Sequence, residues 1–189
     1  MNSRIDLIRA NELSKLPVVT VKGGEDAAEI RDVVYDADRH RLIGFTLNKR
    51  GWLSGRLRTA LPIEMVTGIG RHAVMVLDES CLVDAGGAPQ ALSSPKSDHD
   101  VIGNDVVSTS GAVLGTVVDV IIETGEHPSV VGYETETDDG NLFIPASAQT
   151  SLSASNLVVP ATAEEFTRND LAGFGAAVDS FRDRLKGES

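Results

Sequence analysis

The chain has a single cysteine, Cys81, among its 189 residues. One cysteine excludes an intramolecular disulfide and is typical of a protein in a reducing compartment. No apolar run approaches the ~18–20 residues of a membrane span, and residues 1–8 lack the continuous apolar stretch of a secretory signal. We therefore expect a cytoplasmic protein without a membrane span.

Charge of one sign is missing from two long stretches. Residues 97–167 contain no Lys or Arg, and residues 39–63 contain no Asp or Glu. The formal net charge is −11, and residues 85–189 carry all of it with 5 basic and 16 acidic residues. Such an acidic protein is disfavoured as a general binder of nucleic acid. The two halves are expected to differ in surface charge.

Residue patterns for catalysis or cofactor binding are also missing. No Gly-rich turn leads into the Lys-Ser or Lys-Thr of a phosphate loop, no serine has a triad-like context, and Cys81 has no basic neighbour to activate its thiol. Metal-type donors occur without ligand spacing, in Asp98-His99-Asp100 and in Glu123, Glu126 and His127. We expect no enzyme activity, no cofactor and no metal site.

A repeat is the main feature that is present. Short apolar segments return in the same order, with matching residues separated by nearly constant offsets. These offsets are 88 for Val18 and Val106, 87 for Asp32 and Asp119, 88 for Gly44 and Gly132, and 83 for Pro62 and Pro145. Offsets that drift by a few residues indicate two copies of one domain with loops of different length, and a period this long excludes a solenoid of short units.

Each copy reads as short strands joined by tight turns. In the second copy, the turns are Ser110-Gly111 and residues 138–141. Few helical signals accompany them, which favours a small closed barrel or sandwich. A Gly/Pro/Ser-rich linker separates the copies. The expected domains are a first barrel at 1–84, a linker at 85–97, a second barrel at 98–160 and a C-terminal helix at 161–189.

The C-terminal stretch changes period. Apolar residues recur every three to five positions, which predicts an amphipathic helix with Thr167 or Asn169 as its N-cap. We expect Phe174, Val178 and Phe181 to contact a barrel or a second subunit. Insertion into a membrane surface is disfavoured because the polar face mixes acids with bases.

The strand residues carry a family resemblance. The second copy resembles the PRC-barrel, a small six-stranded β-barrel. The resemblance rests on Val106-Val107, Gly111, Leu114-Gly115, residues 118–121, residues 131–133 and residues 143–145. That domain occurs in the H subunit of the purple bacterial photosynthetic reaction centre and in ribosome maturation factors. The first copy is similar at residues 16–18, 32–34, 43–45 and 61–63. The resemblance implies an all-β fold of two tandem PRC-like barrels and a binding or assembly module, and it carries over no functional residue.

Asp32 and Asp119 occupy the equivalent place in both copies, inside apolar runs. Each could be a poised acid or base. More often such a residue accepts hydrogen bonds from nearby backbone N–H groups, and no His, Ser or Cys accompanies either Asp at a repeated offset. We therefore favour a structural role.

The first copy has an extended basic hairpin at residues 48–58. Trp and Arg together are typical of interaction hot spots, so this segment is the candidate partner contact, through Lys49, Arg50, Trp52, Leu53, Arg56 and Arg58. The alternative is that Trp52 packs on its own barrel. The expected function is a non-catalytic scaffold or adaptor acting through protein–protein contacts, including self-association. Two alternatives remain: binding of a small ligand or anion between the barrels, and an accessory role in RNA processing or ribosome assembly.

Overall fold

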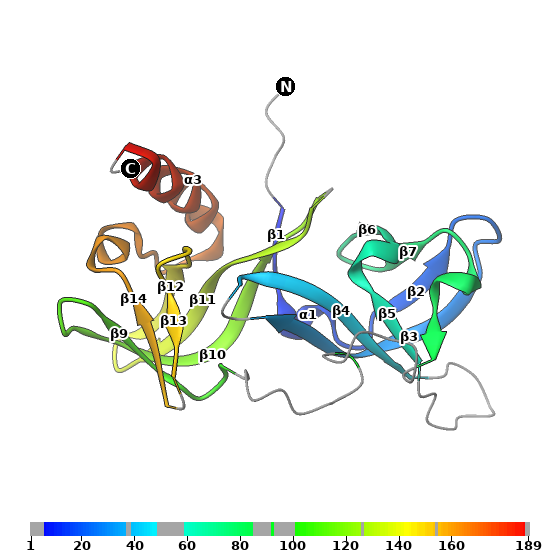
Figure 1. Ribbon diagram of the computed structural model, residues 1–189, viewed down its shortest axis with the longest axis horizontal. Helices are drawn as coiled ribbons and strands as arrows, with labels where there is room; N and C mark the ends of the chain where they lie inside the picture. Colours follow the sequence, from blue (N-terminus) through cyan, green and yellow to red (C-terminus); the bar gives the residue numbers. More distant parts are fainter. Residues whose placement is uncertain are drawn as a thin grey trace.

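A computed structural model gives the fold of most of the chain. The residues that it describes are 6–36, 39–48, 59–84, 92, 101–125, 127–153 and 155–187. Two β units lie side by side, and the C-terminal helix α3 (Leu171–Gly187) lies against one of them (Figure 1). The predicted fold class, all-β with a C-terminal helix, is confirmed.

The first unit contains six principal strands, rich in Val, Ile and Leu. They are β2 (Pro17–Thr20), β3 (Asp26–Asp36), β4 (Arg41–Asn48), β5 (Thr59–Pro62), β6 (Val66–Ile69) and β7 (Val74–Val76). β3 pairs antiparallel with β2 and β4, and β4 pairs with β5. β7 pairs antiparallel with β6 and parallel with β2. Short elements complete the unit: η1 (Ile63–Met65), η2 (Glu79–Cys81) and β8 (Val83–Asp84), which pairs with β5.

The second unit repeats this pattern strand for strand. Its strands are β9 (Asp105–Ser108), β10 (Val113–Glu123), β11 (Ser129–Thr137), β12 (Gly140–Pro145), β13 (Ser151–Leu152) and β14 (Asn156–Val159). β10 pairs antiparallel with β9 and β11, and β11 with β12. β14 pairs antiparallel with β13 and parallel with β9. Because every pairing among the six principal strands of the first unit recurs, the predicted duplication is confirmed.

Even the irregularities of the strands are duplicated. β3 has register shifts against β4 between Ile30 and Asp32 and between Val34 and Tyr35. β10 has its shifts against β11 between Val117 and Asp119 and between Ile121 and Ile122, each 87 residues later. Bulges sharpen the local twist and bend a long strand. Both long strands therefore bend at the same two places.

A glycine is required at one equivalent position of each unit. A Cβ on Gly44 would lie 2.2 Å from the carbonyl oxygen of Leu61, and a Cβ on Gly132 would lie 2.4 Å from that of Ile144. Neither distance is possible for a side chain, because the obstacle is backbone. The sequence repeat Gly44/Gly132 thus marks the close approach of β4 to β5 and of β11 to β12.

The C-terminal extension closes one face of the second barrel. After η3 (Ala161–Phe166), the Asp170 Oδ1 accepts the backbone N–H of Gly173 at 2.7 Å. Asp170 is therefore the N-cap of α3, and the prediction of Thr167 or Asn169 was wrong. Asp170 is the better cap because its carboxylate accepts the N–H of the third helical residue, and its negative charge interacts favourably with the positive end of the helix dipole.

The apolar side of α3 packs on the barrel. Phe174, Val178 and Phe181 are at most 2% exposed. The Phe174 ring centroid lies 5.6 Å from that of Phe143 on β12, and Phe181 lies 5.4 Å from Phe166 of η3. Each such side chain stabilises the fold by about 1.5–3 kcal/mol on burial. Among the described residues, no helix is both long and apolar enough to cross a membrane.

Candidate functional site

The two barrels meet through equivalent residues. Arg41, the first residue of β4, pairs antiparallel with Ser129, the first residue of β11. These positions are 88 residues apart, the offset that also relates Gly44 to Gly132. A residue that pairs with its own counterpart in the other copy marks a local two-fold axis, as in the interface of a symmetric dimer. The contact between the two barrels, here called the joint, therefore has the local symmetry of a homodimer interface within one chain.

Two further contacts cross this joint. The backbone N–H of Val130 donates to the carbonyl oxygen of His40 at 3.2 Å. The hydroxyl of Tyr133, whose ring is fully buried in the second barrel, lies 3.5 Å from Nδ1 of His40. The two barrels are thus joined by direct contacts of both backbone and side chains.

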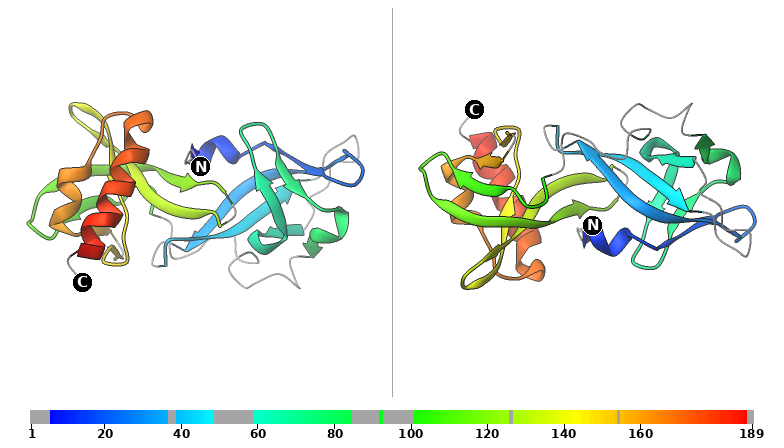
Figure 2. Two further views of the ribbon diagram at one scale, coloured as in Figure 1. Left: turned by 90° about the horizontal axis from the view of Figure 1, so that it is seen from above. Right: turned by 90° about the horizontal axis from the view of Figure 1, so that it is seen from below.

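The N-terminal segment crosses from the first barrel to the second. Residues 6–13, here called the strap, comprise β1 (Leu7–Arg9) and α1 (Ala10–Leu13). β1 pairs antiparallel with the end of β10, at Ile121–Glu123, and so belongs to the second barrel although it precedes the first in sequence. The strap lies at the junction of the two barrels (Figure 2). The predicted domain 1–84 did not anticipate this crossing.

Arg9 of the strap is held by a buried acid of the second barrel. Its Nε and Nη2 donate to the two carboxylate oxygens of Glu134 on β11, at 2.5 and 3.1 Å. The Glu134 side chain is only 4% exposed. A two-point contact between guanidinium and carboxylate is among the strongest side-chain hydrogen-bond pairs. Asn141 Nδ2 donates to the same acid at 2.6 Å.

The rest of the guanidinium environment is also ordered. The Arg9 guanidinium carbon lies 5.4 Å from the centroid of the Phe143 ring, a cation–π distance. Nη1 donates to Glu12 of the strap at 3.2 Å. On the second barrel, Glu134, Asn141 and the Phe143 ring together form a receptor for one arginine, here called the arginine receptor, and Arg9 of the same chain occupies it.

Asp119 lies beside this receptor. It is 4% exposed, and its Oδ1 accepts the backbone N–H of Val120 at 2.8 Å and that of Asn11 in the strap at 3.3 Å. Its Oδ2 is buried without a hydrogen-bond partner among the described residues. Backbone N–H groups are the donors that the sequence favoured for this residue, but the one from Asn11 comes from 108 residues away.

The two buried acids respond to this environment in opposite ways. Desolvation raises the pKa of Asp119, and the nearby Glu134 charge adds to that rise against the backbone hydrogen bonds. Desolvation acts on Glu134 too, but the hydrogen bonds from Arg9 and Asn141 outweigh it and lower the pKa of Glu134. The pKa of Arg9 is raised chiefly by its hydrogen bond to Glu134. Arg9 and Glu134 are therefore a fixed ion pair at neutral pH.

The equivalent place in the first barrel has different chemistry. Thr46 stands where the second barrel has Glu134, and its hydroxyl donates to Asp32 Oδ2 at 2.9 Å. Asp32 also accepts from Arg31 at 2.8 Å, and its side chain is 56% exposed. The same bulge thus carries an exposed acid in one barrel and a buried, strap-bound acid in the other.

Comparison with known families identifies the repeated unit. A model of the PRC-barrel domain matches residues 5–80 and 96–166. The chain belongs to the PRC-barrel family. A comparison with curated proteins finds no match. The two matched segments correspond to the two PRC barrels, and the first begins within two residues of β1.

The predicted contact residues fall into two groups. Those of the basic hairpin, Lys49, Arg50, Trp52, Leu53, Arg56 and Arg58, lie outside the described residues. Phe174, Val178 and Phe181 are described, and they lie between α3 and the second PRC barrel.

The metal-type donors of the sequence are not grouped where they are described. Asp98, His99, Asp100 and Glu126 lie outside the described residues. Glu123 accepts from Arg182 of α3 at 2.6 Å. Within the described ranges, no three His, Cys, Asp or Glu side chains are placed to hold a metal ion.

Sequence reasoning missed Arg9 and Glu134. One signal was available: Glu134 follows the apolar run Val130–Tyr133, whereas its repeat equivalent is the uncharged Thr46. An acid in the middle of an apolar strand requires a buried partner. The partner itself had no local signal, because Leu-Ile-Arg is too short to mark a strand.

Proposed function

We propose that this PRC-barrel protein is a non-catalytic adaptor that binds other proteins through surfaces of opposite charge on its two barrels. The observation that carries the proposal is an apolar surface on an acidic barrel. Val113 is 70% exposed and Val118 39% exposed, both on β10, and Ile102 just before β9 is 47% exposed. Exposed apolar side chains can supply the apolar area of a protein contact.

The charge of this surface indicates the kind of partner. Val113 pairs with Val107 and Thr116 pairs with Asp105 across β9 and β10. The strands β9 to β14 lie within residues 97–167, which contain no Lys or Arg. A partner with basic residues around an apolar centre would match it in charge, and charge complementarity sets specificity and association rate.

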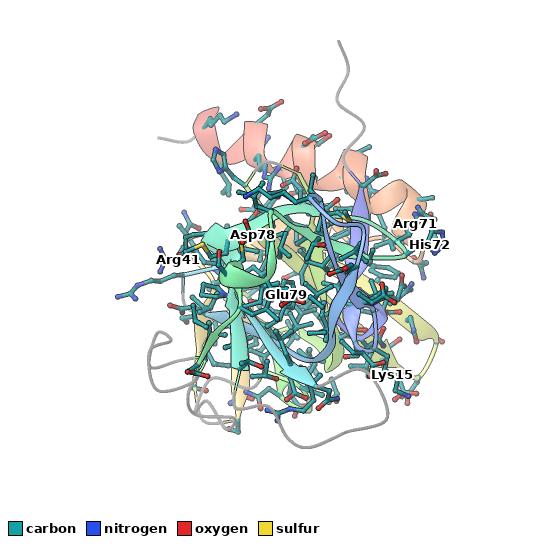
Figure 3. All side chains as sticks on the ribbon, turned by 90° about the vertical axis from the view of Figure 1, so that its right-hand side faces the viewer. Lys15, Arg41, Arg71, His72, Asp78 and Glu79 are labelled. Atoms are coloured by element: carbon teal, nitrogen blue, oxygen red, sulfur yellow. The ribbon has the colours of Figure 1, made fainter. Side chains whose placement is uncertain are left out.

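The first barrel offers the opposite charge. Residues 39–63 contain no acid, and Arg39 and Arg41 are exposed. Arg41 points away from the barrel into solvent (Figure 3). The basic hairpin that follows, from Lys49 to Arg58, is the proposed contact for an acidic partner, with Trp52 and Leu53 as its apolar centre.

The joint favours an adaptor over a binder of small ligands between the barrels. Strand pairing and the contact between His40 and Tyr133 bring the two barrels into direct contact there. The buried acids are engaged by the strap or by backbone N–H groups. Cys81 is buried and free, which fits the proposed cytoplasmic location.

Affinity purification of the tagged full-length chain tests the proposal. We expect Val113→Ser with Val118→Ser to lose at least one co-purifying protein that the parent retains. The matched control is Val21→Ser with Leu77→Ser, because these side chains are similarly exposed, at 57% and 47%, on the first barrel. Equal recovery of all partners by both double variants, or RNA binding that is sensitive to salt, would contradict the proposal.

The basic hairpin is tested in the same assay. Trp52→Ala combined with Arg56→Glu and Arg58→Glu should remove an acidic partner and leave the melting temperature within a few degrees of the parent. Retention of every partner by a folded triple variant would exclude the hairpin as a contact. Unfolding would do the same, since it would mean that Trp52 packs in its own barrel.

A further inference from the structure

We propose that the strap, residues 6–13, is an exchangeable strand that one copy of the chain can donate to the arginine receptor of a second copy. This rests on the proposed adaptor function and adds to it the self-association expected from the sequence, with a second copy of the chain as the partner. In the exchanged pair, Arg9 of one copy would bind Glu134 of the other. Domain swapping of this kind needs no new contact surface.

The first argument is that the strap is held by the second barrel. β1 adds to the edge of β10, and Thr124 donates its backbone N–H to the Asp6 carbonyl at 2.9 Å. Ile8 is 5% exposed and belongs to the core of the barrels. Strand addition at a sheet edge, with side chains anchored in pockets, is a common way of binding a separate peptide.

The second argument is the arginine receptor itself. Glu134 contacts Arg9 at two points, and the guanidinium lies over Phe143. These contacts depend on the sequence of the strap and are the same whether the strap belongs to this copy or another. The site therefore selects a strand of the pattern apolar–apolar–Arg, and the chain's own N-terminal segment has that pattern.

The third argument is the segment that connects the strap to the first barrel. Ser14 ends α1 in an extended conformation, Lys15 has φ of 70°, and β2 begins at Pro17. A left-handed conformation is unfavourable for a lysine. Extending the connection would release this strain, and strained short connections promote exchange. The Lys15 side chain projects outside the barrel (Figure 3), and its backbone N–H donates to the carbonyl oxygen of Ile30 at 2.8 Å, a single hydrogen bond that the exchange would have to break or preserve.

Engineered cysteines can detect the exchange directly. Leu7 faces Glu123 in the β1–β10 ladder. The hydrogen bond between Thr124 and Asp6 makes Leu7 and Glu123 a non-hydrogen-bonded pair, whose Cα separation of ~4.5 Å suits a disulfide. One full-length chain would carry Leu7→Cys and another Glu123→Cys, both with Cys81→Ala. The two are unfolded together, refolded at several concentrations and oxidised.

The expected product is a disulfide-linked dimer of the two different chains. Its yield should rise with chain concentration and exceed the roughly twofold excess over each same-type dimer that random collision gives. Lys15→Gly, which accepts positive φ without strain, should lower the yield about fivefold or more. Lys22→Gly in the exposed β2–β3 turn is the matched control and should leave the yield unchanged.

A single chain with both Leu7→Cys and Glu123→Cys is the control for geometry. It should close an intramolecular disulfide at low concentration. If it closes but the mixed chains yield only the random ratio of dimers, the exchange is refuted; if it fails to close, the strap pairing itself is refuted. Neither result bears on Val113 and Val118, so failure of the exchange is distinguishable from failure of the proposed adaptor surface.

Discussion

The two PRC barrels share their strand order, their bulges and a required glycine, yet they differ at one place on the bulged strand. In the first barrel, Asp32 is exposed and Thr46 is its neighbour. In the second, Asp119 and Glu134 are buried beneath a strap from the start of the chain. Duplication has preserved the backbone geometry of both barrels. In the second barrel, a segment of the same chain covers the position that the first barrel leaves exposed to solvent.

The second difference is the outer face of the sheet. In the second barrel, α3 covers Ile121, Val131 and Phe143, and the Phe174 ring packs directly on Gly132. The first barrel has Ala60 where the second has Phe143, and its β5 pairs with β8. The second barrel thus has a helix packed on this face, whereas the first barrel has an additional strand at the edge of β5.

The largest effect is expected at the face of the second barrel that α3 covers. Phe174→Ala should lower the free energy of unfolding by about 3–5 kcal/mol, because it leaves a cavity between Phe143 and Gly132. Urea denaturation measures this loss. Ser180→Ala on the exposed side of α3 is the control and should change stability by less than about 0.5 kcal/mol. A loss below about 1 kcal/mol for Phe174→Ala would show that α3 is not part of the barrel's core.

The next effect concerns the acid that binds the strap. Glu134→Gln should lower stability at pH 7 by about 2 kcal/mol, because it removes the charge that pairs with Arg9. The pKa of Glu134 is lowered in the fold, so its contribution is fully present above its ordinary value of 4.5 and is lost as pH falls through the folded pKa. Denaturation at several pH values checks this. A difference that stays constant down to pH 3 would contradict the ion pair.

The opposite dependence of stability on pH is expected for Asp119, the neighbour of Glu134. The pKa of Asp119 is raised, so ionised Asp119 destabilises the fold above its folded pKa, and the cost disappears as pH falls below the ordinary value of 3.8. Asp119→Asn should therefore stabilise the protein at pH 7, by about 1 kcal/mol, and give no gain at low pH. Thermal unfolding at pH 7 and pH 3.5 compares the two conditions. Destabilisation at pH 7 would mean that the carboxylate is needed in its charged form.

The smallest effect is expected at the equivalent position of the first barrel. Asp32→Asn should change stability by less than about 0.5 kcal/mol at any pH, because the side chain is 56% exposed and its pairing with Arg31 is screened by water. The same denaturation series provides the measurement. A change as large as that of Glu134→Gln would remove the contrast between the two barrels.

The sequence predicted the fold because the repeat made local signals reinforce one another. Asp32 and Asp119 marked the bulged strands, and Gly44 and Gly132 marked the close approach of neighbouring strands. These features depend on backbone geometry within one hairpin. They therefore require the same residue type at the same place in both copies, which the sequence shows as matching residues at a nearly constant offset.

The strap could not be predicted in the same way. Leu7 pairs with Glu123, 116 residues later, and a pairing so distant leaves no local pattern. The repeat-equivalent positions of β1, about 95–97 in the second copy, lie outside the described residues. The Asp170 cap was missed for a smaller reason: three neighbouring residues could cap a helix, and only the path of the chain after η3 decides which one does.

Amide hydrogen exchange tests the central claim most directly, because it reads both bulged strands in one experiment. In the full-length parent, residues 6–13 and 119–123 should be protected together, and so should residues 32–36 of the first barrel. Arg9→Ala should accelerate exchange in the strap and at 119–123, by about tenfold or more for a loss of 1.4 kcal/mol, and leave residues 32–36 unchanged. Equal acceleration in both barrels, or none in either, would contradict the account that the strap is a separate element locked onto the second barrel by one arginine.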